Sequence, residues 1–503
     1  MFAKERLYPE AQCQTVPGAS ISSHLPELTE SIRFQGSDGV WQKLQRFQAS
    51  VLDGVAVLFA GGPVWSVSWA PIPDYEDHQY LALATHTNVE STHEMSSLYN
   101  YPGIIQIWAL GAIKNTTREA VCPHMVVGIA QRRGPVWGLA WCPAGVYTQD
   151  RIGLLAAACG DGNVVVYAVP HKTNTSGDPM SNCLSLKPVW ELKLGCEMMS
   201  QCTCVDWHSA APHSVIAGGF ANGMVALWDL ATTSPLLKSG STLLPFKVIE
   251  AHQSAVKSVK LSCTEGIVYM MSASLDRTAK FWNLDDTRAP VSFLRKACVT
   301  DAVMTNNWLM SINSYDDVYS LNNSHVTGCT FRDFFTSANA NFVMQPGTVW
   351  GLSFNDWLNG CAYASEMGKV SSFFRQQLLV TEDSKKINKS AFIEDLATCT
   401  AHSIKDDSVL TRGFGTMYRD CVSTMGLKFE FGGKLRGGKS TVCSSDNMDS
   451  FPIRSFNTVS WNQNMNSFVW LAAGMQCGLV VVPRVSSLHP NDLIELEKLK
   501  DNL

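Results

Sequence analysis

The sequence predicts an all-β fold, a seven-bladed β-propeller. A short motif recurs along the chain: GPVWSVSWAP begins at Gly62, GPVWGLAWCP at Gly134 and GTVWGLSFND at Gly347. Each copy has a glycine turn followed by alternating apolar residues, which is the periodicity of a strand. Weaker copies begin at Cys202, Ser254, Lys296 and Ser455. Seven copies of one strand-rich unit indicate a repeat architecture.

Each copy is followed by two further strand patterns around a tight turn. After Gly134 these are IGLLAAAC, the turn GDGN and VVVYAV, and after Cys202 they are SVIAGGF, ANG and MVALWDL. Asp-Gly and Asn-Gly turns suit hairpins. Such units cannot bury both faces alone, but seven of them closed into a ring can.

The repeats also suggest domain boundaries. We expect a polar, flexible segment over residues 1–34, the propeller over 35–487 and a C-terminal tail over 488–503. The fourth strand of each blade is expected in the less regular segments between units. The step from the sixth to the seventh blade is far longer than the roughly 40–45 residues of one blade. We therefore expect a long insertion there, at about 376–450.

The fourth unit is the most regular, and it resembles the WD repeat. It reads AH and then SASLDRTAKFWNL. In that family a His, a Ser or Thr, an Asp and a Trp form a buried hydrogen-bonded set, which maps here to His252, Ser274, Asp276 and Trp282. Buried polar groups need partners. We interpret these residues as structural rather than as a catalytic Ser/His/Asp arrangement, and we expect no catalytic residues. The other units lack the complete set, so the repeats are degenerate.

The composition favours a large, sheet-rich, intracellular protein. The chain has 503 residues, 46% of them hydrophobic and 17% charged, and a formal net charge of −5. Because the net charge is negative, the chain as a whole does not have the excess of basic residues that is typical of nucleic-acid-binding proteins. MFAKERLYPEAQ at the N-terminus lacks the apolar core of a signal peptide, and the apolar run at 467–482 is too short and interrupted to span a bilayer.

The cysteines do not form a metal-binding pattern. Sixteen of them are scattered along the chain. The close pair Cys202 and Cys204 has a spacing that puts both side chains on the same face of a strand, and no second pair has zinc-ligand spacing. We interpret them as buried thiols in a reducing compartment. We expect neither a metal nor a cofactor.

Residues 433–440, GKLRGGKS, match the phosphate-binding loop pattern G-x-x-x-x-G-K-[ST]. The strand pattern GLKFEFG precedes them, and LKFEFG is a candidate outer strand of a blade. No amphipathic helix pattern follows at 441–452, although phosphate binding needs a helix N-terminus there. We interpret the octet as a glycine-rich turn with solvated cations. The alternative is a nucleotide-binding protein, which predicts ATP or GTP binding through Lys439.

Three tryptophans and several cations are candidate contact residues. Trp65, Trp137 and Trp350 follow a glycine turn in three different blades, so they lie near one rim of the ring. They suit partner anchors, but packing between blades is the interpretation we favour. The polar loop at 86–103 is a candidate recognition loop, and a disordered loop is the alternative. The candidate phosphate contacts are Arg132, Arg133, Arg295, Lys296, Lys434, Arg436 and Lys439.

Segments from several blades resemble one family in particular, the WD-repeat subunit of general transcription factor IIIC. The resemblance is carried by RIGLLAAACGDGNVVVYAVPH, AGGFANGMVALWDLATTSPL, GTVWGLSFNDWL, YLALATHTN with YPGIIQIWALG, and EAHQSAVKSV. It covers about residues 50–487 but not the long insertion. It implies a nuclear, non-catalytic scaffold that joins a second propeller subunit and the large B-box-binding subunit. Together these would assemble on the internal promoters of tRNA genes for RNA polymerase III.

Two further expectations concern partners. The sequence has no recognition helix, zinc finger or strong basic face, so we expect this chain to meet DNA mainly indirectly, through the complex. We expect no membrane and no small-molecule substrate. The alternative is a generic WD-repeat scaffold, such as a ubiquitin-ligase substrate receptor, because fold alone does not decide between partners.

Overall fold

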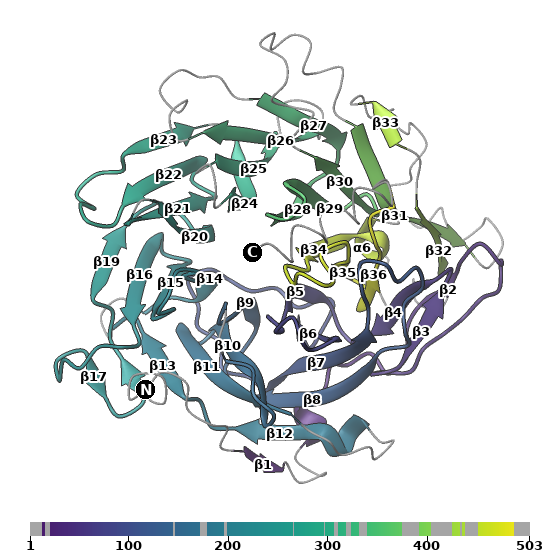
Figure 1. Ribbon diagram of the computed structural model, residues 1–503, viewed down its shortest axis with the longest axis horizontal. Coiled ribbons are helices and arrows are strands. Elements are labelled where there is room, and N and C mark those ends of the chain that lie inside the picture. Colours follow the sequence, from purple (N-terminus) through teal and green to yellow (C-terminus); the bar gives the residue numbers. More distant parts are fainter. Residues whose placement is uncertain are drawn as a thin grey trace.

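The protein is built almost entirely of β-strands arranged in a ring, as Figure 1 shows for the computed structural model. The structure describes residues 13–15 and 21–486, except 144–145, 172–178, 196–198, 265, 296, 306–309, 318–322, 331–339, 375–391, 404–424, 433–434 and 438–450. Among these residues the strands fall into seven sheets. We number the blades in chain order by their innermost strands.

The innermost strands form a closed circle. They are β5 (Val64–Trp69), β9 (Val136–Trp141), β14 (Cys202–Trp207), β20 (Val256–Thr264), β24 (Cys298–Thr305), β28 (Val349–Asn355) and β34 (Phe456–Trp461). Each of them contacts the next, and β34 contacts β5. The prediction of a WD-repeat β-propeller is therefore confirmed.

The remaining strands complete each blade outward. Blade one adds β6 (His78–Thr85), β7 (Gly103–Ala112), β8 (His124–Gln131), β12 (Cys183–Leu186) and β1 (Cys13–Thr15). Blade two adds β10 (Arg151–Cys159), β11 (Asn163–Pro170), β13 (Trp190–Lys193), β18 (Thr242–Leu243) and β17 (Lys238–Ser239). Blade three adds β15 (Val215–Phe220), β16 (Met224–Asp229) and β19 (Lys247–Glu250). Blade four adds β21 (Ile267–Ser274), β22 (Thr278–Asn283) and β23 (Ser292–Arg295).

The last three blades follow the same plan. Blade five adds β25 (Met310–Asp317), β26 (Asn323–Thr330) and β27 (Ala340–Pro346). Blade six adds β29 (Gly360–Ser365), β30 (Lys369–Phe374), β31 (Phe392–Ser403), β32 (Met425–Phe431), β2 (Arg33–Gln35) and β33 (Leu435–Gly437). Blade seven adds β35 (Leu471–Met475), β36 (Leu479–Val482), β4 (Val55–Phe59) and β3 (Ala49–Leu52). The helical turns are η1 (Ser22–His24), η2 (Pro179–Asn182) and α6 (Phe451–Arg454), and no described helix is long and apolar enough to cross a bilayer.

Blade seven joins the two ends of the chain. Its inner three strands come from residues 456–482, and its outer two come from residues 49–59. The β36–β4 pair is antiparallel, with Leu479 opposite Phe59. Phe59 is fully buried. Pairing strands from the two ends of the chain closes the ring and removes two open sheet edges.

Blade six corrects the predicted bounds of the insertion. Strand β31 lies inside the segment 376–450, yet it is the fourth strand of this blade. Strand β32, which contains LKFEFG, pairs with β31 as a fifth strand, with Lys428 opposite Thr400. LKFEFG therefore does form an outer strand. Of the predicted insertion, only β32 and β33 are described as additions to the four-stranded plan.

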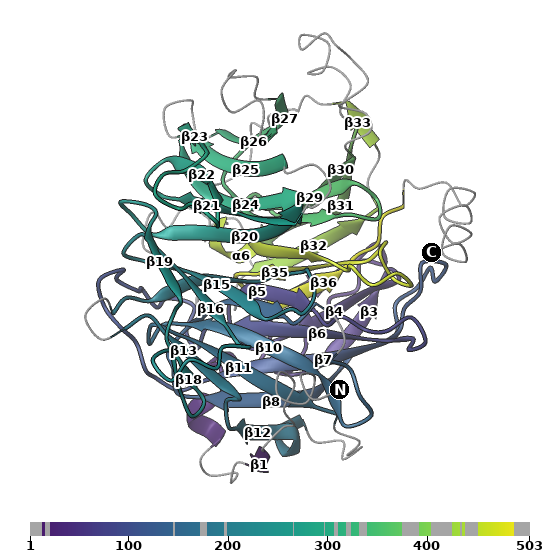
Figure 2. The ribbon, with the colours of Figure 1, turned by 60° about the vertical axis from the view of Figure 1, so that its left-hand side comes forward.

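The N-terminal segment also differs from expectation. Strand β2 pairs in parallel with β32, with Phe34 opposite Leu427. Ile32 and Phe34 are buried, and the Phe34 ring lies 6.3 Å from that of Phe429. Residues 21–34 are therefore packed against the propeller rather than a free polar tail. Both views place β1 and β12 together at the rim of blade one (Figures 1 and 2).

The hydrophobic core lies between neighbouring blades. Middle strands such as β10 and β29 are buried along their whole length, because a blade is packed against each of their faces. This explains why they read as continuous runs of apolar and small residues. Where inner strands come closest, a glycine is needed: a Cβ on Gly351 would lie 2.9 Å from the Cα of Thr458.

Candidate functional site

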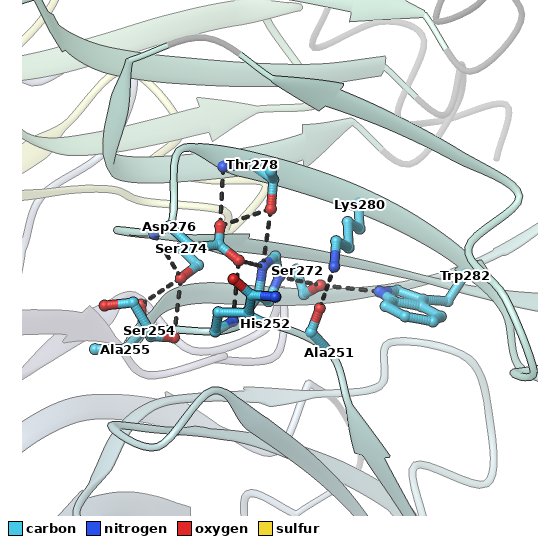
Figure 3. A network of polar contacts seen from close by, with 11 residues as sticks. Ala251, His252, Ser254, Ala255, Ser272, Ser274, Asp276, Thr278, Lys280 and Trp282 are labelled. Carbon is cyan, nitrogen blue, oxygen red and sulfur yellow. Dashed lines mark hydrogen bonds and ion pairs between the residues drawn. The ribbon is translucent and has the colours of Figure 1, made fainter.

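The predicted polar set of blade four forms a network of polar contacts (Figure 3). His252 Nε2 lies 2.8 Å from Ser272 Oγ, and His252 Nδ1 lies 3.0 Å from Asp276 Oδ2. Trp282 Nε1 donates to Ser272 Oγ at 2.9 Å. The serine that links His252 to Trp282 is therefore Ser272 and not Ser274, which the sequence motif singled out.

Ser274 has a different contact pattern in the same network. Its hydroxyl donates to the carbonyl of Ala255 at 2.9 Å and accepts from the backbone N–H of Asp276 at 3.1 Å. Burial would raise the pKa of Asp276, but hydrogen bonds from His252 and Thr278 hold it well below its ordinary value. Ser272 is fully buried and so is the His252 side chain. No substrate could reach this Ser/His/Asp arrangement, so the geometry supports a role in blade packing.

A channel of about 730 Å³ runs through the centre of the ring, lined by the seven innermost strands. Each of these strands has a β-bulge near its start. The extra residues are Trp65, Trp137, Thr203, Lys257, Thr300, Trp350 and Asn457. All seven line the channel. Bulges re-aim side chains, which is how the three predicted tryptophans come together at one mouth of the channel.

The tryptophans contact one another and the loop at 86–103. The rings of Trp65 and Trp350 lie 6.2 Å apart, edge to face. His86 lies 5.9 Å from Trp65 and 4.9 Å from Trp137, and His93 lies 5.3 Å from Trp137. Burial, with the neighbouring His93, lowers the pKa of His86 to about 3. The tryptophans are half-buried, and their use as partner anchors stays a prediction.

Hydrogen bonds fix this loop over blades one to three. His93 Nε2 lies 2.6 Å from the Tyr101 hydroxyl. Gln201 accepts from Trp137 Nε1 at 3.0 Å and donates to the carbonyl of Glu94 at 2.6 Å. The candidate recognition loop is therefore part of an ordered aromatic cluster that covers one side of the channel mouth.

The channel also holds charged groups that sequence reasoning missed. Lys260 Nζ lies 3.0 Å from Asp206 Oδ1. Burial raises the pKa of Asp301 to about 6, which would suit a general base. Both Asp301 oxygens, however, accept backbone N–H groups, from Ala302 and from Leu352 of the next blade, each at 2.8 Å. Asp301 therefore joins blades five and six.

The candidate phosphate contacts do not gather in one place. Arg133 lies 3.0 Å from Asp161 and 2.5 Å from Glu191, so its charge is already paired. This pairing argues against Arg133 as a phosphate contact, which stays a prediction. Arg132 is exposed beside it, while the backbone of Arg295 belongs to β23 in blade four and that of Arg436 to β33 in blade six. Lys296, Lys434 and Lys439 lie outside the described residues.

The described part of GKLRGGKS is a strand, so for Leu435–Gly437 the interpretation as a glycine-rich turn is wrong, and these residues do not form a phosphate-binding loop either. Residues Leu435–Gly437 form β33, which pairs with β31, with Arg436 opposite Ile393. A phosphate-binding loop instead turns its successive N–H groups toward the ligand. Lys439 and Ser440 lie outside the described residues.

The cysteine pair is also arranged differently from the prediction. A bulge separates Cys202 from Cys204. Cys202 Sγ lies beside Gly218 and Cys204 Sγ beside Gly219. Because consecutive residues of a strand face opposite sides, the two thiols do not share a face. Within the described ranges, no group of three or more His, Cys, Asp or Glu side chains could hold a metal ion.

The chain is similar to a WD-repeat family and to subunits of transcription factors. Residues 244–283 match the family "WD domain, G-beta repeat". The chain is 28% identical to "General transcription factor 3C polypeptide 2" of Homo sapiens over 90% of this chain and 55% of that protein. It is 24% identical to "Transcription factor tau subunit sfc6" of Schizosaccharomyces pombe over 92% of this chain and 70% of that protein. "WD repeat and SOCS box-containing protein 1" of Homo sapiens is 27% identical over 21% of this chain.

These comparisons confirm the predicted resemblance to the WD-repeat subunit of general transcription factor IIIC. The chain spans about half the length of the human relative. The similarity to transcription factor subunits runs through nearly all of this chain, whereas the similarity to the SOCS-box protein covers a fifth of it.

Proposed function

We propose that this chain is a non-catalytic scaffold subunit of transcription factor IIIC and acts in the nucleus. The observation that carries the proposal is similarity to two transcription factor subunits over 90% and 92% of the chain. The sealed Ser272–His252–Asp276 network supports a role without catalysis, because a hydrolytic triad needs an accessible nucleophile.

In this proposal the propeller joins a second propeller subunit and the large B-box-binding subunit. The complex then assembles on internal promoters of tRNA genes for RNA polymerase III. The ring supplies protein-binding surface, and DNA contact is mainly indirect. The pairing of Arg133 with Asp161 and Glu191 supports this, since it argues against one of the few candidate phosphate contacts.

The outer rim of blades three and four is the candidate partner surface. Among the described strands, these blades end on β19 and β23 with no further strand, whereas blades one, two and six are extended by β12, β18 and β32. Two large apolar side chains of this rim are exposed: Phe246, next to β19, at 45%, and Phe293, in β23, at 59%. Exposed apolar patches and open sheet edges both favour protein binding.

The test is a pull-down of the tagged chain from nuclear extract, with partners identified by mass spectrometry. Recovery of the other factor IIIC subunits in near-stoichiometric amounts is expected. Recovery of cullin-type ligase components instead would favour the generic WD-repeat scaffold. Indirect DNA contact is checked separately: the purified chain should bind a B-box duplex and a scrambled duplex equally at physiological salt, and a clear preference for the B box would contradict it.

A further inference from the structure

A second hollow lies on the side of the ring away from the three tryptophans. Its volume is about 540 Å³, and its walls include Tyr75, Glu76, Tyr80, Tyr147 and His171. The connections that follow β5 and β9 build most of it, whereas Trp65 and Trp137 lie at the starts of those strands. We call it the tyrosine hollow. Aromatic rings around one carboxylate make it chemically distinct from the channel.

Glu76 gives the tyrosine hollow a fixed negative charge. Its Oε1 accepts from the backbone N–H of His78 at 3.1 Å and lies 3.0 Å from His78 Nδ1, and its Oε2 accepts from the Tyr147 hydroxyl at 3.1 Å. Burial would raise the pKa of Glu76, but these hydrogen bonds lower it below its ordinary value. The carboxylate is therefore ionised at neutral pH. Since a carboxylate offers about four acceptor sites, Oε2 can accept one more donor.

The aromatic walls are held in place around that charge. The His171 ring lies 5.6 Å from that of Tyr80 and 5.0 Å from that of Tyr147, both edge to face. Burial lowers the pKa of His171 although Glu76 and Asp150 favour its charged form. His171 thus adds no positive charge near pH 7. Its Nε2 atom is buried and has no hydrogen-bond partner among the described residues.

Tyr75 forms the outer lip and is 81% exposed, a large aromatic side chain that intramolecular packing leaves to solvent. Tyr75 lies close enough to Tyr147 to affect its ionisation. The pKa of Tyr147 is raised by burial, by Glu76 and by the neighbouring Tyr80 and Tyr75. Aromatic faces attract cations, and they do so most strongly beside an anion and away from bulk water.

We propose that the tyrosine hollow binds an arginine side chain of a partner protein. A guanidinium is planar, weakly hydrated and able to stack on an aromatic ring while it donates to a carboxylate. Here it would lie against the tyrosine rings and donate an N–H to Glu76 Oε2. A lysine ammonium is more strongly hydrated, so it loses more on leaving water and binds more weakly. The site does not depend on which complex the chain belongs to.

The test uses three short peptides, Ac-Gly-Arg-Gly-NH2 and its lysine and citrulline analogues. Citrulline has nearly the shape of arginine but no charge. Binding is followed by NMR on the full chain with ¹³C-labelled tyrosine rings. The arginine peptide should shift the signals of Tyr75 and Tyr147, with the lysine peptide weaker and the citrulline peptide weaker by about tenfold or more. No shift at about 10 mM peptide, or equal binding of the citrulline peptide, would overturn the proposal.

Variants assign the effect to the tyrosine hollow. Glu76→Gln should weaken arginine binding by about tenfold or more, since Glu76 is the one carboxylate among the described residues that line the hollow. Tyr75→Ala should weaken it several-fold, and because Tyr75 is exposed this variant should fold even if Glu76→Gln does not. Glu119→Gln, an exposed carboxylate outside the hollow, is the matched control and should change nothing. Unchanged binding in Tyr75→Ala would also overturn the proposal.

Discussion

His86 should make the protein lose stability in mild acid. Its ring is buried between Trp65 and Trp137, and its pKa is lowered to about 3. In the unfolded chain a histidine has a pKa of about 6.5. Because the folded value is lower than the unfolded one, the contribution of neutral His86 is fully present above about pH 6.5. It is lost as the pH falls from there toward 3.

The magnitude at pH 5 follows from the unfolded state. His86 is still neutral in the folded protein at pH 5. In the unfolded chain the same histidine is protonated, because pH 5 lies about 1.5 units below its unfolded pKa. The free energy of unfolding should therefore drop by about 2 kcal/mol between pH 8 and pH 5 from this residue alone. The figure depends little on the folded pKa, as long as that value stays well below 5.

The assay is urea denaturation of the wild type and of His86→Phe at pH 8, 6 and 5. Phenylalanine keeps an aromatic ring between the tryptophans but cannot titrate. Other groups titrate in this range, and the raised pKa of Asp301 acts in the opposite direction. The prediction therefore concerns the free energy of unfolding of the wild type minus that of His86→Phe, which should fall by about 2 kcal/mol from pH 8 to pH 5. His124→Gln, at an exposed histidine, should keep the wild-type pH dependence. A constant difference between wild type and His86→Phe would refute the reasoning.

Four further outcomes are expected. Ser272→Ala should lower the free energy of unfolding by about 1–3 kcal/mol, measured in urea, because two buried ring nitrogens lose their partner; an unchanged midpoint would contradict the bridging role. Phe59→Ala should cost about 3–5 kcal/mol in the same assay, since β4 closes the ring, and a neutral result would show that closure does not depend on this strand. Phe293→Ser should reduce recovery of factor IIIC subunits in the pull-down without changing the melting temperature, and undiminished recovery would remove this rim as the partner surface. Neither the wild type nor Lys439→Ala should bind ATP or GTP at millimolar concentration by calorimetry, and saturable binding lost in the variant would restore the nucleotide interpretation.

Local patterns predicted the inner strands well, for a physical reason. The alternation in VWSVSW and VWGLAW arises because one face of each inner strand packs between blades and the other lines the channel. The hairpin turns were readable because tight turns require particular residues. What local patterns could not reveal was pairing between distant segments. The closing pair β36–β4 joins residues more than 400 positions apart. Neither strand has a sequence feature that identifies the strand with which it pairs.

Other features that the sequence did not reveal are buried polar groups, bulges and contacts made by a loop. Strand β31 carries Glu394 and Asp395 and lies in the segment expected from the sequence to be an insertion. In the structure both are buried: Ser486 donates to Glu394 and Ser371 to Asp395. The bulges were equally hidden, since an extra residue in a strand looks like any other. The tryptophans were correctly placed near one rim, but their histidine neighbours come from a loop whose path only the fold defines.

The structure narrows where a scaffold function can lie. Ser272 and the His252 side chain of blade four are buried, and His86 and His93 of the loop at 86–103 pack against Trp137. Besides the half-buried tryptophans, the rim around Phe293 and the tyrosine hollow around Glu76 are two separate candidate surfaces. They belong to different blades and share no contact residue, so their variants should act independently. If both surfaces hold the same partner, combining Phe293→Ser with Glu76→Gln should lower its affinity by the product of the two single effects. If they hold different partners, each variant should release only one protein from the recovered complex.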